Sequence, residues 1–155
     1  MVKGGENMKI YKSTIPKLSL VREKSGIKKV KIKSSKDAYE YARQFYKEDI
    51  DIYESAFLLL LNRASNTMGW VKISQGGIGG TIMDVRIITK YAIDILCSAV
   101  ILYHNHPSGD PQPSQEDINL TKTVKDGLKI FQIMLLDHII LTKEDHFSFA
   151  DNGLI

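Results

Sequence analysis

The pattern of apolar and polar positions predicts a chain in which strands alternate with helices. Runs of apolar or strictly alternating residues predict β-strands at 18–21, 30–33, 57–61, 70–73, 100–103, 133–142 and 147–149. The run at 57–61 reads Phe-Leu-Leu-Leu-Leu and contains no polar residue. Such a run is typical of a strand that is buried on both faces of a sheet. We therefore expect this segment to lie at the centre of the fold.

Three segments carry apolar residues at helical spacing and begin at a residue that favours helix starts. Ser34, Asp84 and Ser114 are the expected capping residues. The predicted helices cover residues 34–46, 84–97 and 114–131. Strands that alternate with helices in this way predict an α/β sandwich built on a mixed sheet.

The bulk composition is that of an ordinary globular protein. The chain has 155 residues, of which 43% are apolar and 25% charged, so one domain with a substantial core is expected. No apolar run has the length of a membrane span, and residues 1–6 lack the apolar segment of a signal peptide. The single cysteine, Cys97, lies in an apolar stretch and is expected to be a buried, inert thiol. These features predict a cytoplasmic protein that does not enter membranes.

The net charge of +3 conceals an uneven distribution along the chain. Residues 1–50 hold 13 Lys/Arg against 6 Asp/Glu, whereas residues 51–155 hold 8 against 12. We therefore divide the chain into a basic N-terminal extension, residues 1–50, with a short strand and a helix, and a main domain, residues 51–155. The basic extension is open to two interpretations, a solvated face or a surface that contacts nucleic acid.

The candidate chemistry lies in one short string that follows the predicted strand at 100–103. His104 and His106 are two of the four histidines, and Asp117 follows His106 after eleven positions. Side chains at i and i+2 of a strand point to the same face, so both imidazoles can reach one ion. Two histidines and one carboxylate, with a fourth position left for water, are typical of catalytic zinc sites.

The string HNHPSGDPQPSQEDI resembles the signature of the JAMM (MPN-plus) metallopeptidases, and in particular their RadC-like branch. That signature is His-x-His, seven residues, Ser, two residues and Asp, which His104, His106, Ser114 and Asp117 match. Over residues 50–155 the resemblance implies a curved mixed β-sheet flanked by helices, the JAMM/MPN (cytidine-deaminase-like) sandwich. It also implies a zinc-dependent hydrolase that acts on amide, peptide or isopeptide bonds.

The resemblance further implies a catalytic glutamate just before the first core strand. Glu54, three residues before the run at 57–61, is our candidate for the general base. Three nearby acids are alternatives, namely Glu48, Asp49 and Asp51. Ser114 has two compatible roles, as the cap of the helix that begins there and as a hydrogen-bond donor to the oxyanion of a tetrahedral intermediate.

Three further polar residues, one of them inside this string, are expected to have structural roles. Asp110 is interpreted as a turn residue in the loop, which is rich in proline and glycine. His138 is expected to be a core histidine satisfied by hydrogen bonds. His146 falls in a predicted hairpin turn, so we expect it to be exposed.

Other functions remain open at this stage. The RadC-like branch has been linked to DNA repair, which suggests a DNA-binding accessory protein, but residues 1–50 lack the Gly-x-Gly hairpin between two helices that its full-length members carry. A binding scaffold with the MPN fold but without the chemistry is a second alternative. The letters His-Asn-His also occur in the name of the HNH nucleases, whose residues are not consecutive, and we disfavour that interpretation. The sequence carries no signal for the oligomeric state.

Overall fold

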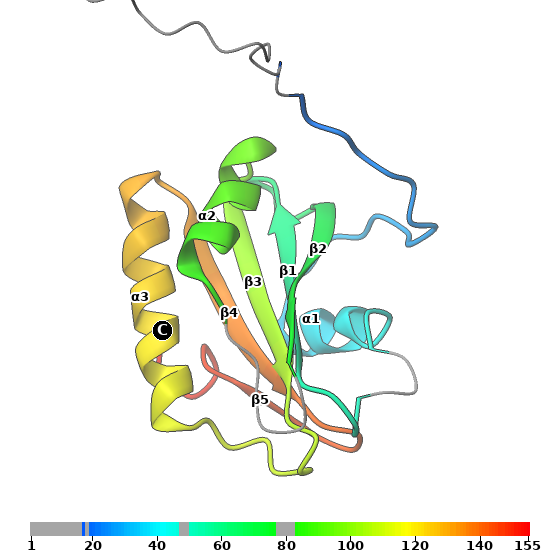
Figure 1. The fold of residues 1–155 in the computed structure, drawn as a ribbon, viewed down its shortest axis with the longest axis vertical. Helices are drawn as coiled ribbons and strands as arrows, with labels where there is room; N and C mark the ends of the chain where they lie inside the picture. Colours follow the sequence, from blue (N-terminus) through cyan, green and yellow to red (C-terminus); the bar gives the residue numbers. More distant parts are fainter. Residues whose placement is uncertain (1–16, 18, 47–49, 77–82) are drawn as a thin grey trace, which may run out of the picture.

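A five-stranded mixed sheet forms the centre of the computed structural model, which describes residues 17, 19–46, 50–76 and 83–155 (Figure 1). The strands are β1 (Ser55–Leu61), β2 (Thr67–Gln75), β3 (Ala99–Asn105), β4 (Met134–Leu141) and β5 (His146–Ser148). Their order in the sheet is β2-β1-β3-β4-β5, and β3 and β4 are the parallel pair. The predicted α/β sandwich on a mixed sheet is thereby confirmed, with β1 and β3 as buried central strands.

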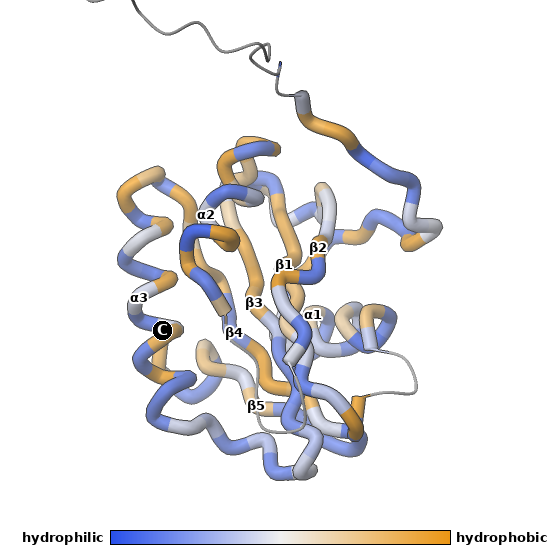
Figure 2. The backbone as a smooth tube through the Cα atoms, viewed as in Figure 1, coloured by the Kyte–Doolittle hydropathy of each residue, from blue (hydrophilic) through white to orange (hydrophobic). Residues whose placement is uncertain are grey.

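Helices cover both faces of this sheet (Figure 1). They are α1 (Ser35–Ala42), α2 (Val85–Asp94) and α3 (Gln115–Ile130). One buried apolar cluster joins α1 to one face, and a second joins α2 and α3 to the other. Figure 2 shows apolar residues concentrated along the central strands, whereas the loop between β3 and α3 is more hydrophilic.

The two-residue period of β3 assigns its side chains to the two layers. Val100 and Leu102 pack in the cluster beneath α2 and α3, while Ile101 and Tyr103 pack in the cluster beneath α1. Because side chains alternate along a strand, His104 continues the row that faces α3. Asn105, the last residue of β3, continues the row that faces α1. The end of β3 thus carries two polar residues, His104 and Asn105, on opposite faces of the sheet.

The expected capping residues are confirmed at all three helix starts. The side chains of Ser34, Asp84 and Ser114 each accept a hydrogen bond from a backbone N–H in the first turn. The helix ends differ from the prediction for α2, which stops at Asp94 rather than near Cys97. Leu96 there has a positive φ of 52°, and the N–H of Cys97 donates back to the carbonyl of Ala92. This is the hydrogen bond of a Schellman motif, which terminates the helix without glycine.

Helix α1 is also shorter than predicted, since it ends at Ala42. The chain turns here, and the ring of Phe45 stacks on that of Trp70 with centroids 4.9 Å apart. Instead of continuing as a helix, the chain packs the ring of Phe45 against the sheet.

The strand predicted at 18–21 is wrong for residues 19–21, which have no regular secondary structure; Leu18 lies outside the described residues. Leu20 and Val21 are exposed, so these apolar side chains do not pack against a core. The strand predicted at 30–33 is reduced to a single bridge between Lys31 and Asn66. Among the described residues, no helix is long and apolar enough to cross a membrane. The division of the chain at residue 50 stays a prediction.

Candidate metal centre

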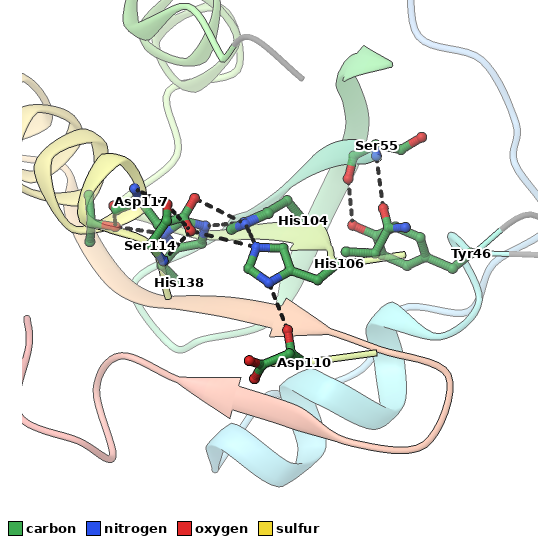
Figure 3. Close-up of polar contacts among 10 residues, drawn as sticks. Tyr46, Ser55, His104, His106, Asp110, Ser114, Asp117 and His138 are labelled. Carbon is green, nitrogen blue, oxygen red and sulfur yellow. Dashed lines mark hydrogen bonds and ion pairs between the residues drawn. The ribbon is translucent and has the colours of Figure 1, made fainter. Parts of the chain in front are cut away.

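The three predicted ligands meet where β3 ends and α3 begins (Figure 3). His104 Nε2 lies 3.0 Å from His106 Nε2 and 3.2 Å from Asp117 Oδ1, and His106 Nε2 lies 3.6 Å from Asp117 Oδ2. One candidate ligand atom from each residue lies within 4.8 Å of the others. His104 is fully buried and Asp117 nearly so, whereas the side chain of His106 is 18% exposed. The cluster is therefore open to solvent on the side of His106.

Backbone hydrogen bonds of the loop from His106 to Ser114 hold this loop beside the cluster. Gly109 has a φ of +87°, and its N–H donates to the carbonyl of His106. The side chain of Asp110 accepts from the N–H of Gln112, so its predicted role as a turn residue is confirmed. The carbonyl of Asp110 also lies 2.8 Å from His106 Nδ1. A carbonyl oxygen can only accept, so His106 Nδ1 carries a proton and donates it there.

Ser114 and Asp117 form a capping box at the start of α3. The N–H and the hydroxyl of Ser114 both donate to Asp117 Oδ2, at 2.8 and 2.7 Å. The N–H of Asp117 donates to Ser114 Oγ in return. Oδ2 is thereby occupied, and Oδ1 is left to face His104. The capping role predicted for Ser114 is confirmed, while its role toward an oxyanion stays a prediction.

A buried chain of hydrogen bonds fixes the tautomer of His104. The Thr121 hydroxyl donates to the carbonyl of Asp117 at 2.6 Å, so it must accept from His138 Nδ1, also at 2.6 Å. Neutral His138 then presents an unprotonated Nε2, which accepts from His104 Nδ1 at 2.8 Å. His104 Nε2 is consequently the unprotonated nitrogen of a neutral imidazole. His138 is fully buried, as expected of a core histidine satisfied by hydrogen bonds.

These assignments test whether the residues fit a metal ion. His104 and His106 both use Nδ1 as a donor, so each neutral imidazole has its lone pair on Nε2. These two lone pairs and a carboxylate oxygen of Asp117 point into the same small space. Three acceptors this close repel one another unless a cation lies between them. Ligands bound tetrahedrally at zinc-ligand distances lie about 3.3 Å from one another. The two contacts to His104, at 3.0 and 3.2 Å, are close to that spacing, so the donor set fits zinc.

The electrostatics of the cluster agree with this need for positive charge. Burial opposes ionisation of Asp117, but the neighbouring imidazoles of His104 and His106 outweigh it and hold the pKa of Asp117 well below its ordinary value. The hydrogen bond to Asp117 raises the pKa of His106, against partial burial. Burial and the neighbouring His104 lower the pKa of His138 far below its ordinary value. A proton on His106 can therefore supply the missing cation when no metal is bound.

Glu54 lies on the histidine side of the sheet by strand register. Ala56 pairs with His104 at the end of the antiparallel β1/β3 ladder, and Glu54 and His106 each lie two residues beyond that pair, just outside the two strands. Ala56 belongs to the row that faces α2 and α3, and the two-residue period assigns Glu54 to the same row. Of the alternatives, Asp51 is exposed and pairs with Lys143 at 3.1 Å. Glu48 and Asp49 lie outside the described residues.

Two of the remaining expectations have clear outcomes. Cys97 is buried, and burial raises the pKa of its thiol to about 11, as expected of an inert thiol. His146 was expected to be exposed, and this is wrong: its ring is partly covered because it stacks on Tyr39 with centroids 4.0 Å apart. The role of Thr121 as the hydrogen-bond partner of His138 was not predicted from the sequence. Its position four residues after Asp117 on a helix would have placed it beneath the ligand.

Comparisons with known proteins agree with this geometry. A family model described as the RadC-like JAB domain matches residues 32–154. The chain is 38% identical over 133 residues to a UPF0758 protein of Flavobacterium johnsoniae, covering 86% of this chain and 57% of that protein. It is 42% identical over 103 residues to a UPF0758 protein of Porphyromonas gingivalis, covering 66% of this chain and 45% of that one. The chain thus spans about half the length of the curated relatives it matches.

The hydrogen-bond chain through Thr121 generates a first prediction. Replacing Thr121 with Val removes the acceptor of His138 Nδ1, so the tautomers of His138 and His104 are no longer fixed. We expect zinc affinity to fall about 10- to 100-fold, the usual effect of losing a partner of a metal-bound histidine. Thr123→Val is the matched control, because the Thr123 hydroxyl makes the same bond to a carbonyl of α3, that of Asn119, but contacts no histidine. Competition with a chelator measures both affinities, and equal losses in the two variants would contradict the prediction.

The raised pKa of His106 generates a second prediction. Zinc must displace the proton that Asp117 stabilises on His106, whose ordinary pKa is 6.5. Apparent zinc affinity should therefore fall as the pH decreases from about 8 to 6, approaching tenfold per pH unit for one displaced proton. Chelator competition across this range, with the folded state checked at each pH, measures the slope. A pH-independent affinity would contradict the pKa shift.

Proposed function

We propose that this chain, which belongs to the RadC-like JAB domain family, is a zinc-dependent hydrolase of amide, peptide or isopeptide bonds. The observation that carries the proposal is the convergence of two unprotonated imidazole nitrogens and one carboxylate at an opening to solvent. Three protein ligands with a remaining coordination position characterise catalytic zinc sites, whereas structural zinc sites have four.

His104, His106 and Asp117 would hold the metal. Zinc bound by two neutral imidazoles and one carboxylate supplies Lewis-acid chemistry, which lowers the pKa of a coordinated water towards about 7 and polarises a substrate carbonyl. The chain's own residues supply the remaining steps. The Thr121–His138 pair keeps His104 in the tautomer that can coordinate, and the carbonyl of Asp110 does the same for His106.

Glu54 is assigned the role of general base and acid. Its carboxylate takes a proton from the attacking water as the oxygen adds to the carbonyl carbon. It then returns that proton to the leaving nitrogen as the carbon–nitrogen bond breaks, so no net proton is lost. The support is the two-residue alternation that assigns Glu54 to the same face as Ala56, the partner of His104, together with the half-buried position of Glu54.

Ser114 is assigned stabilisation of the tetrahedral intermediate. Its hydroxyl donates to Asp117 Oδ2, which also accepts from the Ser114 N–H. The hydroxyl can therefore turn to a developing oxyanion without leaving Oδ2 unpaired. A donor of this kind contributes most when the negative charge appears, which favours the transition state over the bound substrate.

Paired variants at the site generate the third prediction. We expect His104→Ala to lose zinc and hydrolysis together. Glu54→Gln should retain zinc but lower the rate by about 10²- to 10⁴-fold, because only proton transfer is removed. Zinc content is measured by elemental analysis, and hydrolysis with a panel of peptide and ubiquitin-like amide substrates. Glu116→Gln, which changes an exposed acid in the first turn of α3, is the matched control. Wild-type protein that binds no zinc would refute the proposal.

The basic extension supports a second candidate function, the binding of nucleic acid. Residues 19–33 contain six Lys/Arg and one acid, and none of these side chains forms an ion pair with another described residue. A cavity of about 410 Å³ lies between this segment and the β1–β2 turn, lined in part by Arg22, Lys29 and Lys31. Backbone bonds from Ile32 to Ser65 and from Thr67 to Val30 hold the segment beside that turn. Lys29 and Lys31 are therefore held beside this turn.

Salt dependence tests this second candidate and is the fourth prediction. If Arg22, Lys29 and Lys31 each contact a phosphate, replacing all three with Ser should lower the slope of log affinity against log salt by about 3. The measurement is fluorescence anisotropy with a short duplex DNA. Replacing Lys122, Lys125 and Lys129 of α3 with Ser removes the same charge elsewhere and should leave the slope nearly unchanged. If the two triple variants had equal effects, the interaction would depend on net charge alone and not on this surface.

A further inference from the structure

The residue between the two histidines, Asn105, is fully buried and uses its amide on one short segment. Its Nδ2 donates to the carbonyls of Ile50 and Tyr53, at 2.5 and 2.8 Å. Its Oδ1 accepts from the N–H of Ser55 at 2.8 Å. All three bonds therefore go to residues 50–55, the segment that carries Glu54.

Tyr46 holds the same segment through the next backbone group. Its hydroxyl, which is buried, donates to the carbonyl of Ser55 at 3.0 Å. The N–H of Ser55 is thus held by Asn105 and its carbonyl by Tyr46. Figure 3 shows Ser55 and Tyr46 on one side of the histidine pair, with Ser114, Asp117 and His138 on the other.

The backbone of Glu54 is also fixed on its other side. Its carbonyl accepts from the N–H of Gly76, just beyond the end of β2. Since the peptide that joins Glu54 to Ser55 is held from β2 and from Asn105, the direction of the Glu54 side chain is set by the alternation of the strand. Asn105 and Ser55 face α1, and Glu54 falls on the histidine face.

We propose that Asn105 and Tyr46 are positioning residues that hold Glu54 beside the metal centre. The inference rests on the proposed function, in which Glu54 moves the proton. Asn105 belongs to the same backbone as His104 and His106, so its amide connects the base directly to the metal ligands. The distance between base and metal centre is then set by β3 and by three hydrogen bonds, two of which hold the carbonyls of Ile50 and Tyr53 in the loop that precedes Glu54.

The energetics favour this role over general stabilisation. An internal hydrogen bond contributes only about 0.5–1.5 kcal/mol net, because the same groups bond to water in the unfolded chain. An apolar residue at position 105 would extend the apolar row of Ile101 and Tyr103, but it would leave the N–H of Ser55 and the carbonyls of Ile50 and Tyr53 without this partner. What only the amide supplies is a fixed arrangement of three backbone groups around Glu54.

Cobalt-loaded protein tests the inference without requiring a substrate. The visible absorption of bound cobalt follows the ionisation of the group in the remaining coordination position, and a neighbouring carboxylate opposes that ionisation. Glu54→Gln should therefore move the midpoint to lower pH, by about one unit. We expect Asn105→Ala and Tyr46→Phe to move it in the same direction, with cobalt affinity unchanged. The double variant N105A/E54Q should match E54Q alone.

Asn62→Ala is the matched control, because Asn62 also holds backbone N–H groups, those of Ala64 and Asn66, at the opposite end of β1. It should lower stability and leave the cobalt midpoint unchanged. If N105A and Y46F both keep the wild-type midpoint while E54Q shifts it, the positioning role is refuted and the proposed function stands. If wild-type protein gives no cobalt spectrum, or E54Q causes no shift, the proposed function fails and the inference fails with it. Y46F removes a single hydroxyl, so it decides the question even if N105A does not fold.

Discussion

The alternation of side chains along β3 is the constraint on which the site depends. Within one strand, His104 faces α3 and Asn105 faces α1, so the side chains of this candidate metal ligand and of the proposed positioning residue lie on opposite faces of the sheet. A shift of one residue in the β1/β3 register would exchange the two faces and bring an amide to the metal position. The buried apolar pairs that precede it, such as Leu58 with Leu102, make such a shift costly. The packing of the core therefore fixes the positions of the residues in the site.

Burying two histidines and an aspartate at one point carries a cost in free energy, and the start of α3 offsets part of it. The capping box gives Asp117 two donors from Ser114, and the positive end of the helix dipole favours its negative charge. Throughout the described part of the chain, every buried side-chain nitrogen and oxygen has a hydrogen-bond partner. The cost that remains is the mutual repulsion of the converging lone pairs, which only a proton or a metal ion relieves. Metal binding should consequently stabilise the folded state.

Much of the fold and the ligand set could be predicted from local sequence signals. The apolar run at 57–61 and the capping residues Ser34, Asp84 and Ser114 identified a central strand and three helix starts, because these signals depend on near neighbours. Helical spacing places Thr121 near Asp117, but the hydrogen-bond partners of Thr121, Asn105 and Tyr46 could not be predicted in the same way. Each of these residues acts on a partner from another element, and the sequence does not state which elements meet. The same limit explains the error at His146, whose exposure is reduced by Tyr39 from a distant part of the chain.

The choice between a hydrolase and a binding scaffold can be argued from the stability of the site. Replacing a whole buried ion pair with well-packed apolar residues is often neutral or stabilising by about 1–4 kcal/mol, whereas removing only one partner is destabilising. A domain that only bound a partner would gain from apolar residues at both positions 104 and 117, which lie beneath α3 and in its first turn. This chain instead keeps both residues buried, and adds His138 and Thr121 to hold one histidine in the tautomer that leaves its Nε2 unprotonated. A neutral scaffold has no use for that tautomer, whereas a metal ligand requires it.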